Sequence, residues 1–455
     1  MDTDNFKGEK SLLNQDMPYI RAEKARYLYL CVTSTMPHGI SIWWEVNKNK
    51  YVTKETYLHT TPAVYRFDLA ILRAAGPSGK WGYYWDGKIS GFGVKSSEDC
   101  QIKWLKFSNS RINFDDRFPL ICMIDYPEVI HFEVTRNCNL NCYMCRKNRE
   151  REVRKIGVPN LDYGIFEKTI PFARHINNVA FFGWGEPLVH PQFHKFIDAI
   201  DRIKDRNDPS LANRQKPYVN FTSNATLLTE DMIRRLIKQG LNEIVVSIDS
   251  QDPSNYNFIR ENADFKEVIS NLQNLKRIKQ ELAVTYPALT IAVVAMRRNI
   301  EELPEIVKLA VELGSKRVLV TYLMVATKGL EKESLFYHQD LANRMFDLTE
   351  KAAQENEVTL TLPPRFGTNA DVKGYCDDVQ EMFYIRGEGT VLGCCIATDY
   401  IIGDLRKESP EDIWQGKRRK QLIDNLKKGI LKGKCRDCYK FTGTDINLRE
   451  THIKV

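Results

Sequence analysis

Eight of the eleven cysteines in this 455-residue chain fall in two groups, and grouped thiols are its clearest chemical signal. The first group has the spacing C-x3-C-x2-C and consists of Cys138, Cys142 and Cys145. The second lies near the carboxyl end and comprises Cys376, Cys394, Cys395, Cys435 and Cys438. The polar amino terminus lacks the apolar segment of a secretion signal, so we expect a cytoplasmic chain. Grouped cysteines in such a chain favour bound metal over disulfides.

The first cysteine group suits an iron–sulfur cluster that keeps one iron open. Three thiolates close in sequence can bind three irons of a [4Fe–4S] cluster, whereas a structural cluster takes four protein ligands. An open coordination position is what a catalytic metal needs. The alternatives are a zinc knuckle or three buried thiols. A zinc site normally has a fourth cysteine or histidine nearby, and the nearest candidate, His131, lies within the predicted preceding strand.

The cysteine spacing, the preceding strand and the residues CNLNCYMC (138–145) together resemble the cluster loop of the radical S-adenosylmethionine (SAM) superfamily. In that family the open iron chelates the amino and carboxylate groups of SAM. An electron from the cluster cleaves SAM to methionine and a 5′-deoxyadenosyl radical, which abstracts a substrate hydrogen. The resemblance implies that SAM and a [4Fe–4S] cluster are cofactors here, and that flavodoxin, ferredoxin or a similar protein donates electrons.

The turn FFGWGEP (181–187) resembles the GGEP motif of the same family. The resemblance implies that its backbone carbonyls and Glu186 hold the SAM amino group. Gly183 and Gly185 would let the backbone approach the ligand closely. The sequence departs from the family in placing Trp184 between these glycines.

Two later strand ends resemble further SAM-binding motifs. In FTSNATLL, Ser223 and Asn224 would contact SAM, and in VSIDS, Ser247 and Asp249 would bond the ribose hydroxyls. Arg260 matches an arginine that could meet the SAM carboxylate bidentately. The alternative for each residue is strand-end capping or a surface salt bridge.

One histidine pair has the i, i+4 spacing of metal ligands on a helix, namely His190 and His194. Pro191 places His190 at a helix boundary, because proline favours the first helical position. We therefore interpret the pair as a polar helix start.

The second cysteine group reads C-x17-C-x40-C-x2-C through Cys376, Cys394, Cys435 and Cys438. The stretch IRGEGTVLG predicts a β-hairpin that returns Cys394 toward Cys376. Four thiolates make a closed cluster. The pattern, with IGDL and IW before the last pair, resembles the SPASM/Twitch extension of radical SAM enzymes and implies one auxiliary [4Fe–4S] cluster. Cys395 could replace Cys394, and a four-cysteine zinc site is the alternative.

Regular alternation of strands and helices must position these loops. The predicted strands are 128–134, 178–183, 218–223, 243–249, 289–296, 317–324 and 358–362. This alternation predicts an α/β fold, a partial (β/α)6 barrel whose chemistry lies at the carboxyl ends of its strands. The amino-terminal part is instead rich in short aromatic strands, which predicts a β-sandwich. It weakly resembles galactose-binding-like domains of sugar-active proteins, but we interpret its aromatic rings as the core of the sandwich.

We predict five segments along the chain. They are a polar tail (1–24), a β-sandwich (25–115), a radical SAM partial barrel (125–363), a small cysteine-rich auxiliary-cluster domain (364–445) and a carboxyl-terminal tail (446–455). Two basic stretches, 145–155 and 417–434, are interpreted as solvated faces or as attractors of a phosphate group.

The expected activity is net oxidation of a sugar, cyclitol or nucleotide-sugar, with the auxiliary cluster accepting the second electron. One alternative is a SPASM-type maturase that modifies a peptide, and another is a non-catalytic binding protein stapled by zinc. A net charge of +7 is mild for this length, and no apolar run is long enough to span a membrane, so we expect neither nucleic acid nor membrane as partner. The sequence does not single out a catalytic base.

Overall fold

The computed structural model describes residues 126–145, 160–205, 207, 216–325, 329–367, 376–396, 400–431, 433, 435 and 438 and, before residue 126, the strands named below. The chain divides into two compact units. One consists of Met1–Tyr126 with Arg206–Gln215, and the other of Pro127–Asp205 with Lys216–Val455. Among the helices in the described part, none has both the length and the apolar character needed to cross a membrane.

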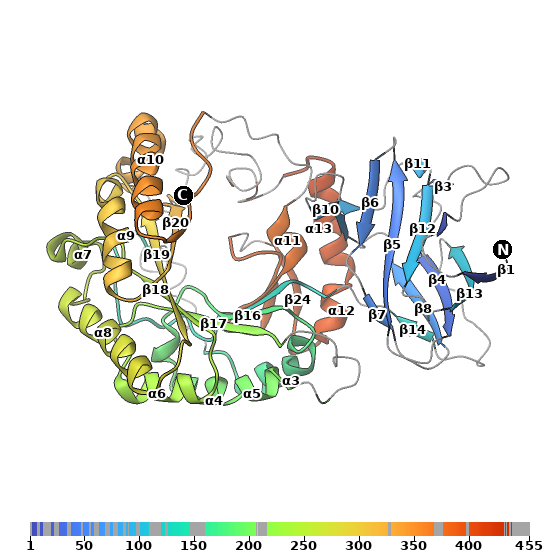
Figure 1. Ribbon diagram of the computed structural model, residues 1–455, viewed down its shortest axis with the longest axis horizontal. Coiled ribbons are helices and arrows are strands. Elements are labelled where there is room, and N and C mark those ends of the chain that lie inside the picture. The colour runs from blue at the N-terminus through green and yellow to red at the C-terminus, as the bar shows by residue number, and fades with distance from the viewer. Residues whose placement is uncertain are drawn as a thin grey trace. The chain divides into compact units, whose positions relative to one another are not determined.

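The described strands of the amino-terminal unit form two main sheets and one small pair (Figure 1). The first sheet runs in the order β1 (Asp2–Phe6), β13 (Gln101–Ser108), β4 (Tyr27–Thr33), β8 (Ala63–Asp68) and β14 (Leu120–Cys122). The second runs β10 (Trp81–Tyr84), β9 (Arg73–Ala75), β6 (Asn49–Thr53), β5 (His38–Val46), β12 (Gly91–Ser96) and β2 (Lys10–Ser11), with β7 (Thr56–Leu58) beside β5. The small pair is β11 (Lys88–Ile89) with β3 (Ile20–Arg21).

The described core of this unit combines aliphatic and aromatic side chains. Trp44, Tyr65 and Phe92 are fully buried, and Trp43 is 6% exposed. These rings therefore serve as core. The segment 1–24, predicted to be a tail, instead supplies strands β1, β2 and β3. Strand pairing uses backbone groups, so a polar segment can join a sheet edge without an apolar pattern.

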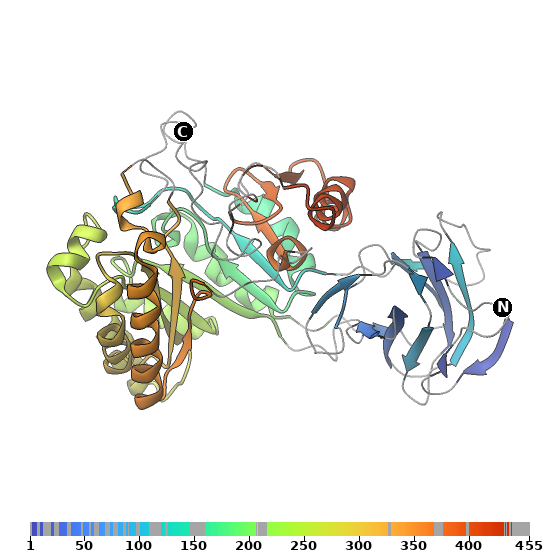
Figure 2. The same cartoon turned by 90° about the horizontal axis from the view of Figure 1, so that it is seen from above.

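The second unit is built on one long sheet (Figures 1 and 2). Its order is β21 (Thr359–Thr361), β20 (Arg317–Tyr322), β19 (Ala288–Ala295), β18 (Glu243–Ser247), β17 (Tyr218–Ser223), β16 (Asn178–Phe181), β15 (Val129–Phe132), β22 (Met382–Ile385), β23 (Thr390–Leu392) and β24 (Ile401–Asp404). The pairs from β15 to β21 are all parallel, so the seven predicted strands and the α/β class are confirmed.

Helices cover the outer face of this sheet (Figure 1). They are α3 (Tyr163–Ala173), α4 (Phe193–Asp198), α5 (Ile200–Ile203), α6 (Glu230–Lys238), α7 (Pro253–Ile259), α8 (Phe265–Glu281), α9 (Leu303–Glu312) and α10 (Gln339–Glu355). Side-chain caps start several of them, since an oxygen at the N-cap satisfies an orphan backbone N–H. The capping residues of α3, α6, α7 and α8 are Asp162, Thr229, Asp252 and Asp264.

Side chains alternate between the helix-covered face and the inner face along β15 and β22. Phe132 contacts Phe166 of α3, and Phe383 contacts Phe172 of the same helix, so both lie on the outer face. The neighbouring residues must then point inward, because successive strand residues face opposite sides. His131 and Tyr384 accordingly meet edge to face on the inner side.

The predicted hairpin in the cysteine-rich segment is confirmed, and Gly389 at its turn has φ +85°. Its first strand, β22, also pairs in parallel with β15. The segment therefore extends the barrel sheet, an attachment that the sequence analysis does not include. Helix α11 (Asp377–Glu381) precedes the hairpin on the chain, and α12 (Pro410–Trp414) and α13 (Lys417–Lys427) follow β24. Residues 446–455 and most of the basic stretch 145–155 lie outside the described residues.

Candidate functional site

The first cysteine loop leaves the carboxyl end of β15. Cys142 is 7% exposed, and Cys138 and Cys145 are half-buried. The backbone N–H of Cys145 donates to the carbonyl of Cys142 at 3.0 Å, and that of Leu140 lies 3.5 Å from Cys138 Sγ. Tyr143 N–H donates to the carbonyl of Ile259 at 2.8 Å, which fixes the loop against the end of α7.

A buried ion pair lies against Cys142. Arg260 donates from Nε to Asp249 Oδ2 at 2.6 Å, and its Nη1 lies 3.8 Å from Cys142 Sγ. The other carboxylate oxygen of Asp249 accepts the N–H of Val294 at 2.8 Å. Burial raises the pKa of the Cys142 thiol, and the Arg260 charge opposes that rise. Both carboxylate oxygens of Asp249 thus have partners within the protein. The contacts of Asp249 and of half-buried Ser247 to the SAM ribose stay predictions.

Glu186 joins the second strand end to the third. Its carboxylate accepts from Ser223 Oγ at 2.8 Å, from the N–H of Asn224 at 2.7 Å and from the N–H of Leu188 at 3.2 Å. The side chain is 2% exposed, and burial raises its pKa to about 7 despite these donors. Glu186 therefore organises the turns around the site, and its contact to the SAM amino group remains a prediction.

Asn224 connects Glu186 to the cysteine loop. Its Nδ2 lies 3.9 Å from Cys138 Sγ and donates to Asn139 Oδ1 at 3.0 Å, while Asn139 donates to Thr226 Oγ1 at 2.7 Å. Ala225 takes φ +60°, which turns the chain sharply after β17. The FTSNATLL turn and the cysteine loop, which were predicted to lie at one site, are therefore in contact.

The glycines of the GWGEP turn pack so closely against neighbouring atoms that a side chain at either position would clash. A Cβ on Gly185 would lie 2.2 Å from the carbonyl oxygen of Thr135 and 2.6 Å from that of Asn137. Glu186 N–H donates to the same Asn137 carbonyl at 2.8 Å. This turn packs directly on the entry to the cysteine loop.

Sequence reasoning missed Glu133, which directly follows β15. Its buried carboxylate accepts from Arg136, Trp184, Tyr384 and Gly387. The sequence feature that could have revealed Glu133 is an acidic residue at the end of an apolar strand, because a buried carboxylate needs hydrogen-bond or charged partners.

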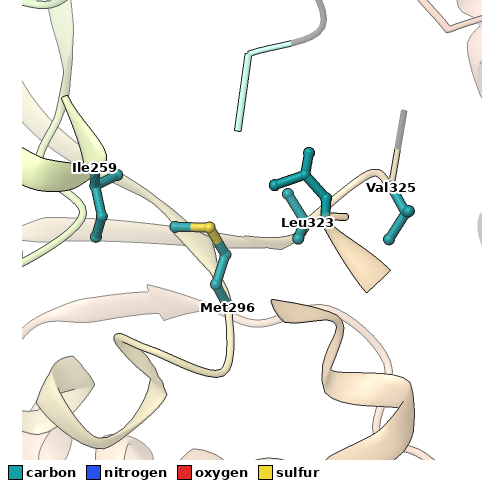
Figure 3. Packing of buried hydrophobic residues seen from close by; sticks show 5 residues of the cluster. Ile259, Met296, Leu323 and Val325 are labelled. Atoms are coloured by element: carbon teal, nitrogen blue, oxygen red, sulfur yellow. The ribbon is translucent and has the colours of Figure 1, made fainter. Parts of the chain in front are cut away.

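Figure 3 shows an apolar cluster, and two residues of the cysteine loop pack against it. Its buried members are Ile259, Met296, Leu323, Val325 and Leu330, and Tyr143 and Met144 of the loop pack against it. Beside it, Tyr256 is fully buried, and its hydroxyl has no hydrogen-bond partner among the described residues. The pKa of Tyr256 is raised by burial, with Arg260, Asp249 and Cys142 as the nearby charges.

The second cysteine group is partly assembled. Burial raises the pKa of Cys376 to about 12, with smaller contributions from Asp378, Cys438 and Cys435, so these thiols are neighbours. Cys394 is 6% exposed. Cys395 packs instead against the inward-facing cluster of Met382, Tyr384 and Leu392. Across the described residues, no three His, Cys, Asp or Glu side chains gather as ligands of a single metal ion.

The histidine pair behaves as the helix boundary that we predicted. His190 is the C-cap of the short helix η2 (Pro187–Val189), and its Nδ1 accepts the N–H of Gln192 at 3.0 Å. Its ring is buried against Phe196, and burial lowers its pKa.

Family comparisons agree with this geometry. Residues 132–310 match the model of the radical SAM superfamily, and residues 376–439 match the SPASM model, described as an iron–sulfur cluster-binding domain. The second match favours iron–sulfur over zinc at the second cysteine group.

Curated relatives share about a quarter of their residues with this chain. The tungsten-containing aldehyde ferredoxin oxidoreductase cofactor-modifying protein of Pyrococcus furiosus is 24% identical over 68% of this chain and 86% of its own length. The AdoMet-dependent heme synthase of Methanosarcina barkeri is 24% identical over 70% of this chain and 90% of its own. The mycofactocin maturase MftC of Mycobacterium tuberculosis is 25% identical over 69% of this chain and 76% of its own.

Solved structures show the same fold. The AdoMet-bound structure of anSMEcpe superposes with a TM-score of 0.51 at 17% identity, over 69% of this chain and 84% of that one. SuiB of Streptococcus suis, bound to its precursor peptide SuiA, gives 0.51 at 16% identity over 71% of each chain.

The residues present fit the cofactors of this family. Three thiols follow one strand, a largely buried guanidinium stands beside one of them, and the glycine turn packs its backbone directly against the entry to the cysteine loop. The chain therefore carries a radical SAM domain over residues 132–310 and a SPASM domain over residues 376–439, and these domains take SAM and [4Fe–4S] clusters as cofactors.

Proposed function

We propose that this protein is an oxidative radical SAM enzyme. The three-cysteine loop would hold the SAM-binding cluster, and the carboxyl-terminal cysteines would hold an auxiliary cluster that accepts an electron from the substrate. When bound, the reduced first cluster and SAM supply the hydrogen-abstracting chemistry of the superfamily. The chain's own residues then have to bind, orient and shield these groups.

The observation that carries the proposal is a pair of partly buried contacts from side-chain donors to cysteine sulfurs. Asn224 Nδ2 lies 3.9 Å from Cys138 Sγ, and Arg260 Nη1 lies 3.8 Å from Cys142 Sγ. Asp249 holds the guanidinium in place through Nε. Donors aimed at thiolate sulfurs are one of the means by which a protein tunes an iron–sulfur cluster.

The SAM contacts follow from the same arrangement. Arg260 is 11% exposed, and a buried guanidinium suits an anionic carboxylate such as that of SAM. The carbonyls of the turn around Gly183 and Gly185 would take the SAM amino group, helped by Glu186. Ser247 and the hydroxyl of Tyr256 are candidates for polar contacts, and the apolar cluster of Figure 3 would exclude water.

Cys376, Cys394, Cys435 and Cys438 would hold the auxiliary cluster. The proximity of Cys376 to the last two thiols supports this set. Cys395 faces the inner cluster around Tyr384 instead, which supports Cys394 as the fourth ligand. An electron donor such as flavodoxin or ferredoxin would reduce the first cluster.

For the substrate we favour a peptide or a cofactor precursor. The support is the naming of three relatives as a cofactor-modifying protein, a heme synthase and a maturase. The predicted oxidation of a sugar, cyclitol or nucleotide-sugar drew on the single auxiliary cluster and on the amino-terminal sandwich, and Trp43 and Trp44 are buried in that sandwich as core. Sugar oxidation therefore becomes the second arm of the test.

The test is anaerobic reconstitution followed by incubation with SAM, a reductant and deuterated candidates from both classes. Deuterium that appears in 5′-deoxyadenosine identifies the class from which hydrogen is taken. The wild type should hold about eight irons for two [4Fe–4S] clusters, and Cys142→Ala about four. Wild-type protein that binds zinc but no iron, and leaves SAM intact, would refute the proposal.

A further inference from the structure

Glu133 lies where three functional segments of the second unit converge. It directly follows β15, and the preceding Phe132 faces the helices, so Glu133 points to the inner face of the barrel. Its side chain accepts the Nε–H of Arg136 at 3.0 Å, the N–H of Trp184 at 3.2 Å and the hydroxyl of Tyr384 at 3.0 Å. A longer contact of 3.5 Å comes from the N–H of Gly387.

These four donors come from three segments of the chain. Arg136 stands two residues before Cys138, at the entry to the SAM-binding cluster loop. Trp184 lies in the glycine turn that faces the same loop. Tyr384 and Gly387 belong to the auxiliary segment, and Tyr384 packs against Cys395, the neighbour of Cys394.

The backbone adds a further link, because Glu133 N–H donates to the carbonyl of Ile385 on β22 at 2.8 Å. The carboxylate is completely buried, with a side-chain exposure of 0%. A buried carboxylate is stable only when hydrogen-bond donors replace its lost hydration. Glu133 therefore needs the donors from Arg136, Trp184 and Tyr384. Burial and the Glu133 charge hold the pKa of Tyr384 well above its usual value, which keeps its hydroxyl protonated as a donor.

The glycine turn is shaped to this side chain. A Cβ on Gly183 would lie 2.5 Å from Glu133 Cγ and 2.7 Å from its Cβ. A glycine is thus required at position 183 to make room for the Glu133 side chain, whether or not Gly183 also contacts SAM.

We infer that Glu133 is a positioning residue that couples the SAM-binding end of the barrel to the auxiliary-cluster segment, by holding Arg136, Trp184 and Tyr384 in one arrangement. This inference rests on the proposed function, because both cofactor sites must be occupied for the coupling to matter. With four donors around it, Glu133 has no role as the substrate's proton acceptor. Its effect reaches SAM and the auxiliary cluster only through its partners.

The test compares Glu133→Gln, Tyr384→Phe and the double variant with wild type, all reconstituted with iron and sulfide. Glutamine keeps the shape but loses the negative charge, so it can no longer satisfy Arg136 and Tyr384 together. The measurements are the SAM dissociation constant, the EPR spectrum and midpoint potential of the auxiliary cluster, and the melting temperature. We expect Glu133→Gln to weaken SAM binding about tenfold or more, as for the loss of a buried charge-assisted hydrogen bond, and also to shift the auxiliary-cluster potential.

Tyr384→Phe keeps the carboxylate and should fold even if Glu133→Gln does not. It should shift the auxiliary potential and also weaken SAM binding by a smaller factor, and the double variant should be less than additive. The matched control is Glu243→Gln, a carboxylate with 6% exposure at the start of β18 that binds Thr290 and Arg317. The control should lower only the melting temperature.

Two outcomes would overturn the coupling alone, and a third would overturn the proposed function together with it. If wild type binds SAM and both clusters, but Glu133→Gln and Tyr384→Phe change only the melting temperature as the control does, the coupling is wrong. A change of activity with pH in wild type that Glu133→Gln alone abolishes would also overturn it, because it would make Glu133 the proton acceptor. Wild type that takes up neither iron nor SAM overturns the proposed function and the coupling with it.

Discussion

Gly185→Ala is the substitution whose effect the structure predicts most sharply. The new Cβ would sit 2.2 Å from the carbonyl oxygen of Thr135 and 2.6 Å from that of Asn137. Both obstacles are backbone atoms, so no side chain can rotate away. The turn must move off the cysteine loop, which also breaks the 2.8 Å bond from Glu186 N–H to Asn137. Overpacking of this kind costs about 1–3 kcal/mol, and the lost bond about 1 kcal/mol more.

If about 3 kcal/mol of that cost falls on the SAM-binding conformation, the dissociation constant for SAM rises roughly 150-fold. Equilibrium dialysis of the reconstituted variant measures this, with iron content as the check that the cluster is present. The control is Gly240→Ala, at φ +68° with open space around it. It should cost about 1–2 kcal/mol of stability through backbone strain and leave SAM binding intact. Equal SAM affinity in wild type and Gly185→Ala would refute the close packing.

Three further predictions follow from the site. Asp249→Asn releases Arg260 from its ion pair, so it should shift the EPR spectrum of the first cluster and weaken SAM binding, whereas Arg234→Gln, at an exposed ion pair with Glu281, should do neither. The pKa of Glu186 rises from 4.5 to about 7 on folding, so the folded state holds a proton longer. The stability of the apo protein should therefore fall as pH rises between 4.5 and about 7, and a denaturation series of Glu186→Gln should lack that slope. Finally, Cys394→Ala should lower the iron content from about eight to about four, and Cys395→Ala should leave it unchanged; the reverse result would exchange the two ligands.

Much of the site could be predicted from the sequence because the carboxyl ends of parallel strands share one edge. Glu186, Asn224 and Cys138 come from three strand ends and were expected together, and hydrogen bonds and contacts now connect them. The strands themselves followed from the regular alternation of apolar runs with amphipathic helices.

The parts that could not be predicted depend on long-range pairing. Tyr384 and Glu133 are 251 residues apart, and no local pattern announces their hydrogen bond. The parallel pairing of β22 with β15 is equally non-local. The ion pair between Asp249 and Arg260, which caps the carboxyl end of α7, was also not predicted, and the assignment of Asp249 to ribose stays a prediction. A buried arginine so close would pair with any carboxylate in reach.

The most direct test of the account is the cleavage of SAM by reduced, reconstituted protein, compared between wild type and Cys142→Ala. Wild type should yield 5′-deoxyadenosine and methionine, and Cys142→Ala, which keeps its auxiliary cluster, should yield neither. Equal product from both proteins, or none from wild type that carries its full iron content, would contradict a SAM-binding cluster at Cys138, Cys142 and Cys145.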